Sequence, residues 1–214
     1  MTMTEQFSFG GDIVWRPNPE HIEHANLTAF MRTHGIKDFD ALMKKSTSDV
    51  VWFTDAVLKF LDVQFYEPYT KVVDLTDGIQ FPKWCVNGKM NIVHNCVDKW
   101  RKAEGGIPLR EAVVWEGEEG ITKTLTYEEL YKEVNKAANA LRSLGLGKSD
   151  AIGIFMPMTP EIVIALLAIA KIGGVILPLF SGYGAGAIVS RLADANAKAL
   201  FAADGAYRRG KAVE

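Results

Sequence analysis

The chain has 214 residues, of which 48% are hydrophobic and 23% are charged, and its formal net charge is -2. This composition is that of a soluble globular protein, and the near-neutral balance provides no long-range field to favour nucleic acid or an anionic membrane as partner. The longest apolar run is shorter than the roughly 18 residues that span a bilayer, and MTMTEQFSFGGD lacks the basic start and apolar core of a signal peptide, so we expect a cytoplasmic protein.

The first hundred residues are predicted to be short helices and extended segments rich in aromatic residues. Apolar spacing predicts helices over 21–31, 38–43 and 49–61, with Ser48 as N-cap of the last. Proline and glycine punctuate residues 65–91, which we expect to be extended or turning. A further helix is expected over 91–101, ended by Gly105-Gly106.

The next segment predicts a hairpin followed by a well-capped amphipathic helix. Short strands are expected over 112–115 and 121–125, around a turn at 116–120. Thr126 and Glu129 form a capping box, in which each side chain satisfies the backbone amide of the other. The helix that they start should end at Gly145-Leu146-Gly147.

Residues 150–211 predict the unit that organises the chain. Residues 162–170 are apolar at every position, so the helix there should be buried on all sides, with Thr159 as its cap. Strands are expected over 151–155, 175–180 and 199–202, with a third helix over 185–195. Strands that alternate with helices predict an α/β fold with a parallel sheet covered on both faces.

The two cysteines are not expected to carry chemistry. Cys85 and Cys96 have no second cysteine pair nearby, and His94 alone does not complete a metal site. We interpret both as reduced thiols that pack as small hydrophobic groups, and we expect no metal ligands.

A glycine-rich turn offers a first hypothesis about function. Residues 182–187, GYGAGA, match G-x-G-x-x-A between a strand and a helix, and Asp204 follows the next strand, as in a dinucleotide-binding oxidoreductase. Pro178 in the preceding strand argues against it, because central strands avoid proline. Glycines that serve only turn geometry are the alternative.

A basic segment near the end of the chain offers a second hypothesis about function. Residues 204–211 hold three cations, Arg208, Arg209 and Lys211, beside two glycines. This composition fits a solvated loop, and it equally fits a loop that binds phosphate through guanidinium groups and backbone amides. No Walker-type phosphate loop, G-x-S-x-G elbow or H-E-x-x-H helix occurs.

Several motifs, in order along the chain, resemble those of AMP-forming acyl-CoA synthetases of the acetyl-CoA synthetase type. They are KWCVNGKMN at 83–91 with NCVD at 95–98, WEGE at 115–118, LTYEEL at 125–130, MPMTPE at 156–161, FSGY at 180–183 and ADGAYRRGK at 203–211. The resemblance implies an adenylate-forming ligase that makes acyl-CoA from a short carboxylic acid, with acetate as the expected acid, using ATP, Mg²⁺ and coenzyme A. It assigns residues 1–105 to an N-terminal cap region and residues 106–214 to the first part of the AMP-binding α/β domain.

In that family the ATP and Mg²⁺ motifs, the carboxylate pocket and the adenylation lysine lie further along than these 214 residues. We therefore expect the sequence to be the N-terminal part of such an enzyme, inactive alone and without a catalytic residue. An incomplete sheet would expose an apolar edge and favour self-association. The alternatives are a truncated, non-catalytic paralogue that binds coenzyme A or a partner, and the dinucleotide-binding oxidoreductase.

The resemblance places part of a coenzyme A site in this chain. By position in the motifs, Phe180 and Gly182 border the adenine, Arg208 and Lys211 meet the 3′-phosphate, and Val213 packs near the adenine. An aromatic ring beside a glycine makes a flat slot, and two cations match a dianion. The chain has Phe-Ser-Gly-Tyr where Phe-Gly-Gly-Phe is usual, and Lys211 replaces an arginine of some members, which removes a bidentate contact.

Overall fold

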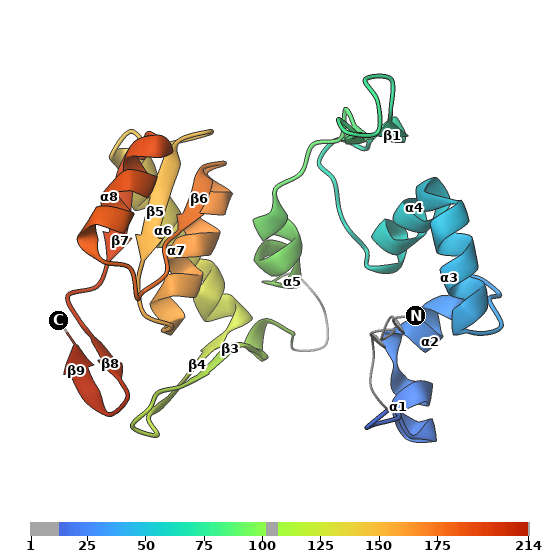
Figure 1. Cartoon of the computed structure of the whole chain (residues 1–214), viewed down its shortest axis with the longest axis horizontal. Helices are drawn as coiled ribbons and strands as arrows, with labels where there is room; N and C mark the ends of the chain where they lie inside the picture. The colour runs from blue at the N-terminus through green and yellow to red at the C-terminus, as the bar shows by residue number, and fades with distance from the viewer. Residues whose placement is uncertain (1–12, 102–106, 214) are drawn as a thin grey trace, which may run out of the picture. The chain divides into compact units, whose positions relative to one another are not determined.

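The structure is a computed structural model that describes residues 13–101 and 107–213. The chain divides into two compact units (Figure 1). The first unit comprises Met1–Val63 and Val72–Trp84, and the second comprises Gln64–Lys71 and Cys85–Glu214. The elements of each unit follow from the capping and burial of its own residues.

Four helices lie in the described part of the first unit. They are α1 (Pro19–His24), α2 (Asn26–Thr33), α3 (Phe39–Ser48) and α4 (Val50–Phe60). Phe30, Leu42 and Ala56 form the buried centre of this unit, with the partly buried rings of Trp52 and Phe53 against them. Most aromatic residues of these helices therefore pack as a core, as expected, whereas Phe39 is 53% exposed.

Three sequence predictions in the helical region were wrong in detail. The helix predicted over 21–31 is two helices, because Ala25 is extended, with φ -69° and ψ 135°. The helix predicted over 38–43 continues to Ser48, which is therefore the last residue of α3. Asp49 takes the N-cap position of α4 instead, and its carboxylate accepts a hydrogen bond from the amide of Trp52 at 2.9 Å.

Short elements connect the helices to the rest of the chain. Strands β1 (Lys71–Asp74) and β2 (Lys83–Val86) pair with each other. The helix predicted over 91–101 is present, but its centre is a π-helix, η1 (His94–Asp98), continued by α5 (Lys99–Arg101). The predicted stop at Gly105-Gly106 lies outside the described residues, and a 3₁₀ turn, η2 (Ile107–Leu109), follows.

The predicted hairpin and capping box are confirmed. Strands β3 (Glu111–Glu116) and β4 (Thr122–Thr126) are antiparallel and lead into α6 (Tyr127–Ser143). The Thr126 hydroxyl accepts from the amide of Glu129 at 3.2 Å, and the Glu129 carboxylate accepts from the amide of Thr126 at 2.8 Å. The two bonds satisfy otherwise unpaired amides at the start of α6, and Gly145, with φ 82°, follows its end.

The predicted parallel sheet is confirmed, and with it the α/β fold class. Strand β5 (Ala151–Phe155) lies in the centre, with β6 (Val175–Pro178) and β7 (Ala199–Ala202) parallel on either side. The crossover helices are α7 (Pro160–Lys171) and α8 (Ala185–Asp194). Pro178 is tolerated because β6 is an outer strand, whose far edge needs no ladder hydrogen bonds.

The central strand shows how both faces of the sheet are covered. Ile152 and Ile154 are buried in one cluster with Ala165, Ala168 and Ile169 of α7. Gly153 faces the other way, and a Cβ there would lie 2.8 Å from Leu192 Cδ2 of α8. Helix α7 is buried on most sides rather than all, since Leu166 is 40% exposed, and Thr159 at its N-cap makes no side-chain capping bond.

The basic segment at 204–211, predicted to be a loop, instead belongs to a hairpin. Strands β8 (Ala206–Arg208) and β9 (Lys211–Val213) pair through a two-residue turn, Arg209-Gly210, with φ values of 55° and 74°. Two positive φ angles identify a type I′ turn, whose twist matches that of paired strands and which readily uses glycine. Among the described residues, no helix has the length and apolar character needed to cross a membrane.

The burial of Ile169 generates a testable prediction about stability. Ile169 is fully buried against β5, so Ile169→Ala should lower the free energy of unfolding by about 2–5 kcal/mol. Leu166→Ala, in the same helix but partly exposed, is the matched control and should cost about 1 kcal/mol or less. Urea unfolding measures both, and equal losses would contradict the described core.

Candidate functional site

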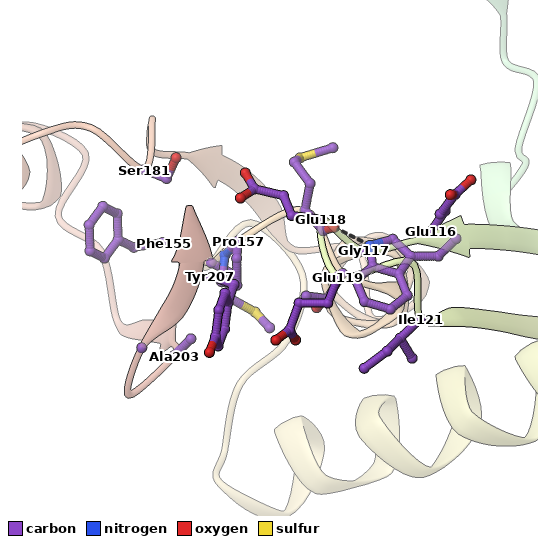
Figure 2. Close-up of a pocket in the computed structure, with 15 residues that line it drawn as sticks. Glu116, Gly117, Glu118, Glu119, Ile121, Phe155, Pro157, Ser181, Ala203 and Tyr207 are labelled. Carbon is purple, nitrogen blue, oxygen red and sulfur yellow. Dashed lines mark hydrogen bonds between the residues drawn. The ribbon is translucent and has the colours of Figure 1, made fainter. Parts of the chain in front are cut away.

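A cavity of about 620 Å³ lies where the parallel strands of the second unit end. Residues 155–159 after β5, Ser181 after β6, and Ala203, Gly205 and Tyr207 after β7 line it on one side. The turn between β3 and β4, with Glu116, Glu118 and Glu119, lines the other (Figure 2). Crevices at the carboxyl ends of strands are where open α/β sheets bind ligands.

Two side-chain contacts hold the β3–β4 hairpin against the start of α7. The indole Nε1 of Trp115 donates to the carbonyl of Met158 at 2.6 Å, and Lys123 Nζ lies 2.6 Å from Glu161 Oε1. Gly117 is needed beside this indole, because a Cβ there would lie 2.6 Å from Trp115 Cη2. The hairpin is thus fixed at the rim of the cavity.

The ion pair with Lys123 also affects the titration of Glu161. The hydrogen bond from Lys123 lowers the pKa of Glu161, against a smaller opposing effect of burial. A carboxyl with a lowered pKa in the folded state contributes stability above its ordinary pKa, and that contribution is lost as the pH falls. The attachment of the hairpin should therefore weaken only in acid.

The predicted adenine-binding pair, Phe180 and Gly182, lies in one tight turn. The amide of Tyr183 donates to the carbonyl of Phe180 at 2.9 Å, and the two rings meet edge to face at 5.6 Å. The Phe180 ring lies against Gly182, where a Cβ would be 2.6 Å from Phe180 Cε1. Phe180 is 60% exposed, so this turn presents an accessible aromatic surface beside Ser181.

The predicted phosphate-binding pair, Arg208 and Lys211, lies on the β8–β9 hairpin. The two residues are register partners beside the turn, so the fold brings their backbones together, and Lys211 is exposed. The side chains of Arg208 and Val213 are outside the described part of the chain. Tyr207 precedes Arg208 in β8, and its side chain lines the cavity opposite Glu119, as Figure 2 shows.

A hydrogen bond joins the two hairpins. The amide of Gly210, in the β8–β9 turn, donates to Oε2 of Glu118 at 2.9 Å. Glu118 and Gly210 are 92 residues apart in the sequence. Sequence reasoning did not identify Glu118 as a site residue, and its position in the WEGE motif was the only signal that pointed to it.

Asn91, Asn95 and Asp98, from the motifs at 83–91 and 95–98, have structural roles in the second unit. The side-chain amide of Asn91 donates to the carbonyls of Ala170 and Lys171, both at 3.1 Å, and so caps the end of α7. Asn95 bonds both backbone groups of Gln64. Asp98 pairs with Lys171 at 2.7 Å, and the two side chains are only 22% and 19% exposed.

The alternative chemistries gain no support from the described residues. Residues 179–184 separate β6 from α8, which is longer than the tight turn that a dinucleotide fingerprint requires. Cys85 and Cys96 are not joined in a disulfide. Within residues 13–101 and 107–213 no group of three His, Cys, Asp or Glu side chains could hold a metal ion.

Comparison with known proteins agrees with the resemblance in the motifs. The model of the AMP-binding enzyme family matches residues 100–214, which is more than half of the chain. The chain belongs to the AMP-binding enzyme family. Residues 39–96 match the model of the acetyl-coenzyme A synthetase N-terminus.

Relatives in this family include enzymes named for different acids. An acetyl-coenzyme A synthetase of Mycobacterium tuberculosis is 42% identical over 197 residues, which is 91% of this chain and 28% of the relative. A 3-hydroxypropionyl-coenzyme A synthetase of Sulfurisphaera tokodaii is 41% identical over 181 residues, 85% of this chain and 27% of the relative. The chain therefore spans less than a third of the length of these relatives.

A solved structure shares the fold. The acetoacetyl-CoA synthetase from Streptomyces lividans superposes with a TM-score of 0.81 at 28% identity. The superposition covers 92% of this chain and 31% of that structure. The arrangement of strands and helices described above is thus that of an acyl-CoA synthetase of known structure.

Proposed function

We propose that the chain is the N-terminal part of an AMP-forming acid–thiol ligase that converts acetate, ATP and coenzyme A to acetyl-CoA, AMP and pyrophosphate. The observation that carries the proposal is the family match over residues 100–214. The match of residues 39–96 to an acetyl-coenzyme A synthetase N-terminus favours acetate over the acids of the other relatives.

The proposed reaction proceeds in two steps, as the resemblance implies. The carboxylate oxygen attacks the α-phosphorus of ATP, and pyrophosphate leaves with the electron pair of the broken bond. The thiol sulfur of coenzyme A then attacks the acyl carbon, and AMP leaves while the thiol loses its proton. Mg²⁺ would neutralise charge on the ATP phosphates, and no residue of this chain is proposed as its ligand.

Within this reaction, residues 180–213 are proposed to bind the nucleotide end of coenzyme A. Phe180 and Gly182 would border the adenine, because the turn offers an exposed aromatic ring that packs against the glycine. Arg208 and Lys211 would pair with the 3′-phosphate, and their adjacent register on the hairpin supports a shared ligand. Val213 would complete the adenine side.

Coenzyme A binding to the purified chain tests this site. Calorimetry should find coenzyme A bound about tenfold more tightly than 3′-dephospho-coenzyme A, because charge-assisted bonds to the phosphate are lost. Arg208→Ala and Lys211→Ala should each remove most of that difference. Lys198→Ala removes an exposed cation from the opposite end of β7 and should change nothing; equal effects at all three positions would contradict the assignment.

The proposal also predicts what the 214 residues cannot do. The family's ATP and Mg²⁺ motifs do not occur in this sequence, so the purified chain supplied with acetate, ATP and Mg²⁺ should form no acetyl-adenylate. Pyrophosphate release coupled to acetate measures the step. Acetate-dependent pyrophosphate release would contradict the assignment of adenylation to residues outside these 214.

A further inference from the structure

We propose that Glu118 is a positioning residue for coenzyme A, which holds the β8–β9 hairpin so that Arg208 and Lys211 can meet the 3′-phosphate together. The inference rests on the proposed function, since it concerns the same site. It adds a residue that neither the motifs nor the comparisons assign. The juxtaposition that carries it is the contact between the tips of two hairpins from distant parts of the second unit.

The β8–β9 hairpin needs an external restraint. Each of its strands has only three residues, and its register pairs β8 with β9 alone among the described strands. An isolated two-stranded hairpin is marginally stable in water. A hairpin that must hold two cations at a fixed separation therefore requires a contact beyond its own ladder.

Glu118 provides such a contact at the turn itself. In a two-residue turn the amide of the second turn residue is not part of the strand ladder, and here the Gly210 amide donates to the Glu118 carboxylate at 2.9 Å. A hydrogen bond from an amide to a carboxylate is about twice as strong as a hydrogen bond between two neutral groups. Figure 1 shows the β3–β4 and β8–β9 hairpins extending from the same end of the α/β layers.

The other hairpin is rigidly placed, so the restraint is transmitted to the sheet. Trp115 bonds Met158, and Lys123 pairs with Glu161, on either side of the turn that carries Glu118. The β8–β9 turn is thus connected through Glu118 and the β3–β4 hairpin to the start of α7. That connection fixes the cations relative to Ser181 and the Phe180–Tyr183 turn, since Ser181 and Tyr207 line one cavity.

The charge of Glu118 and its hydrogen bond should have opposite effects on coenzyme A binding. Arg208, Arg209 and Lys211 flank Gly210 in the sequence. A carboxylate bonded to the Gly210 amide opposes the binding of a phosphate there, so on charge alone its removal would strengthen coenzyme A binding. If Glu118 instead positions the hairpin, a variant that loses the hydrogen bond to Gly210 should bind coenzyme A more weakly. Glu118→Ala and Glu118→Gln separate the two effects, because glutamine keeps an oxygen acceptor but not the charge.

The experiment compares coenzyme A with 3′-dephospho-coenzyme A on the purified chain and its variants. Glu118→Ala should weaken coenzyme A binding about fivefold and leave 3′-dephospho-coenzyme A binding unchanged. Glu118→Gln should retain the preference for the 3′-phosphate. Glu111→Ala removes the same charge from the exposed start of β3, away from the turn and outside the lining of the cavity, and is the matched control that should behave as wild type.

Three results would overturn the inference while leaving the proposed function intact. They are an unchanged preference in Glu118→Ala, tighter coenzyme A binding in both Glu118 variants, and equal losses for both ligands. A wild-type chain without any preference for the 3′-phosphate would instead overturn the proposed site, and the inference with it. Hydrogen exchange of the Gly210 amide is the second readout, and it should accelerate in Glu118→Ala but not in Glu111→Ala.

Discussion

The packing of α7 between the parallel sheet and α6 is the contact on which the rest of the second unit depends. Ala165, Ala168 and Ile169 of α7 cover Ile152 and Ile154 of β5. Other apolar residues of the same helix, including Val163, Ile164 and Leu167, pack against the cluster formed by Val93, Val97, Leu130 and Val134. A helix with two apolar surroundings needs an apolar residue at nearly every position, which explains the unbroken run at 162–170.

The same contact places the candidate site. Because α7 fixes β5, it also fixes residues 155–159, which connect them and form one wall of the cavity. The β3–β4 hairpin bonds to this connection through Trp115 and to α7 through Lys123. Glu118 of this hairpin in turn bonds the amide of Gly210. The β8–β9 hairpin, which carries the proposed phosphate-binding cations, is therefore connected to the core of the sheet.

Sequence patterns predicted the elements whose determinants are local. The apolar run gave α7, β-branched and apolar runs gave β5 and β7, and the Thr126–Glu129 pair gave the start of α6. The errors arose where two neighbouring residues can take the same structural position. Ser48 and Asp49 are both good N-caps, and extension of α3 to Ser48 left the position to Asp49. Residues 204–211 were predicted to be a loop because the three-residue strands β8 and β9 are too short to show alternation.

The candidate site was predictable only in part. The motifs pointed to Phe180, Gly182, Arg208, Lys211 and Val213, but only pairing of β8 with β9 makes Arg208 and Lys211 neighbours across a turn. Glu118 could not be inferred from spacing, because its partner is a backbone amide 92 residues away that any residue except proline could supply. A long-range contact from a side chain to a backbone amide produces no recognisable pattern in a single sequence.

A crystal structure of the chain with coenzyme A bound tests the central claim most directly. The account predicts adenine against Phe180 and Gly182, with the 3′-phosphate about 2.7–2.9 Å from nitrogens of both Arg208 and Lys211. It also predicts that the bond between Glu118 and Gly210 persists in the complex. Coenzyme A whose nucleotide contacts neither Phe180 and Gly182 nor the cations of the β8–β9 hairpin would contradict it.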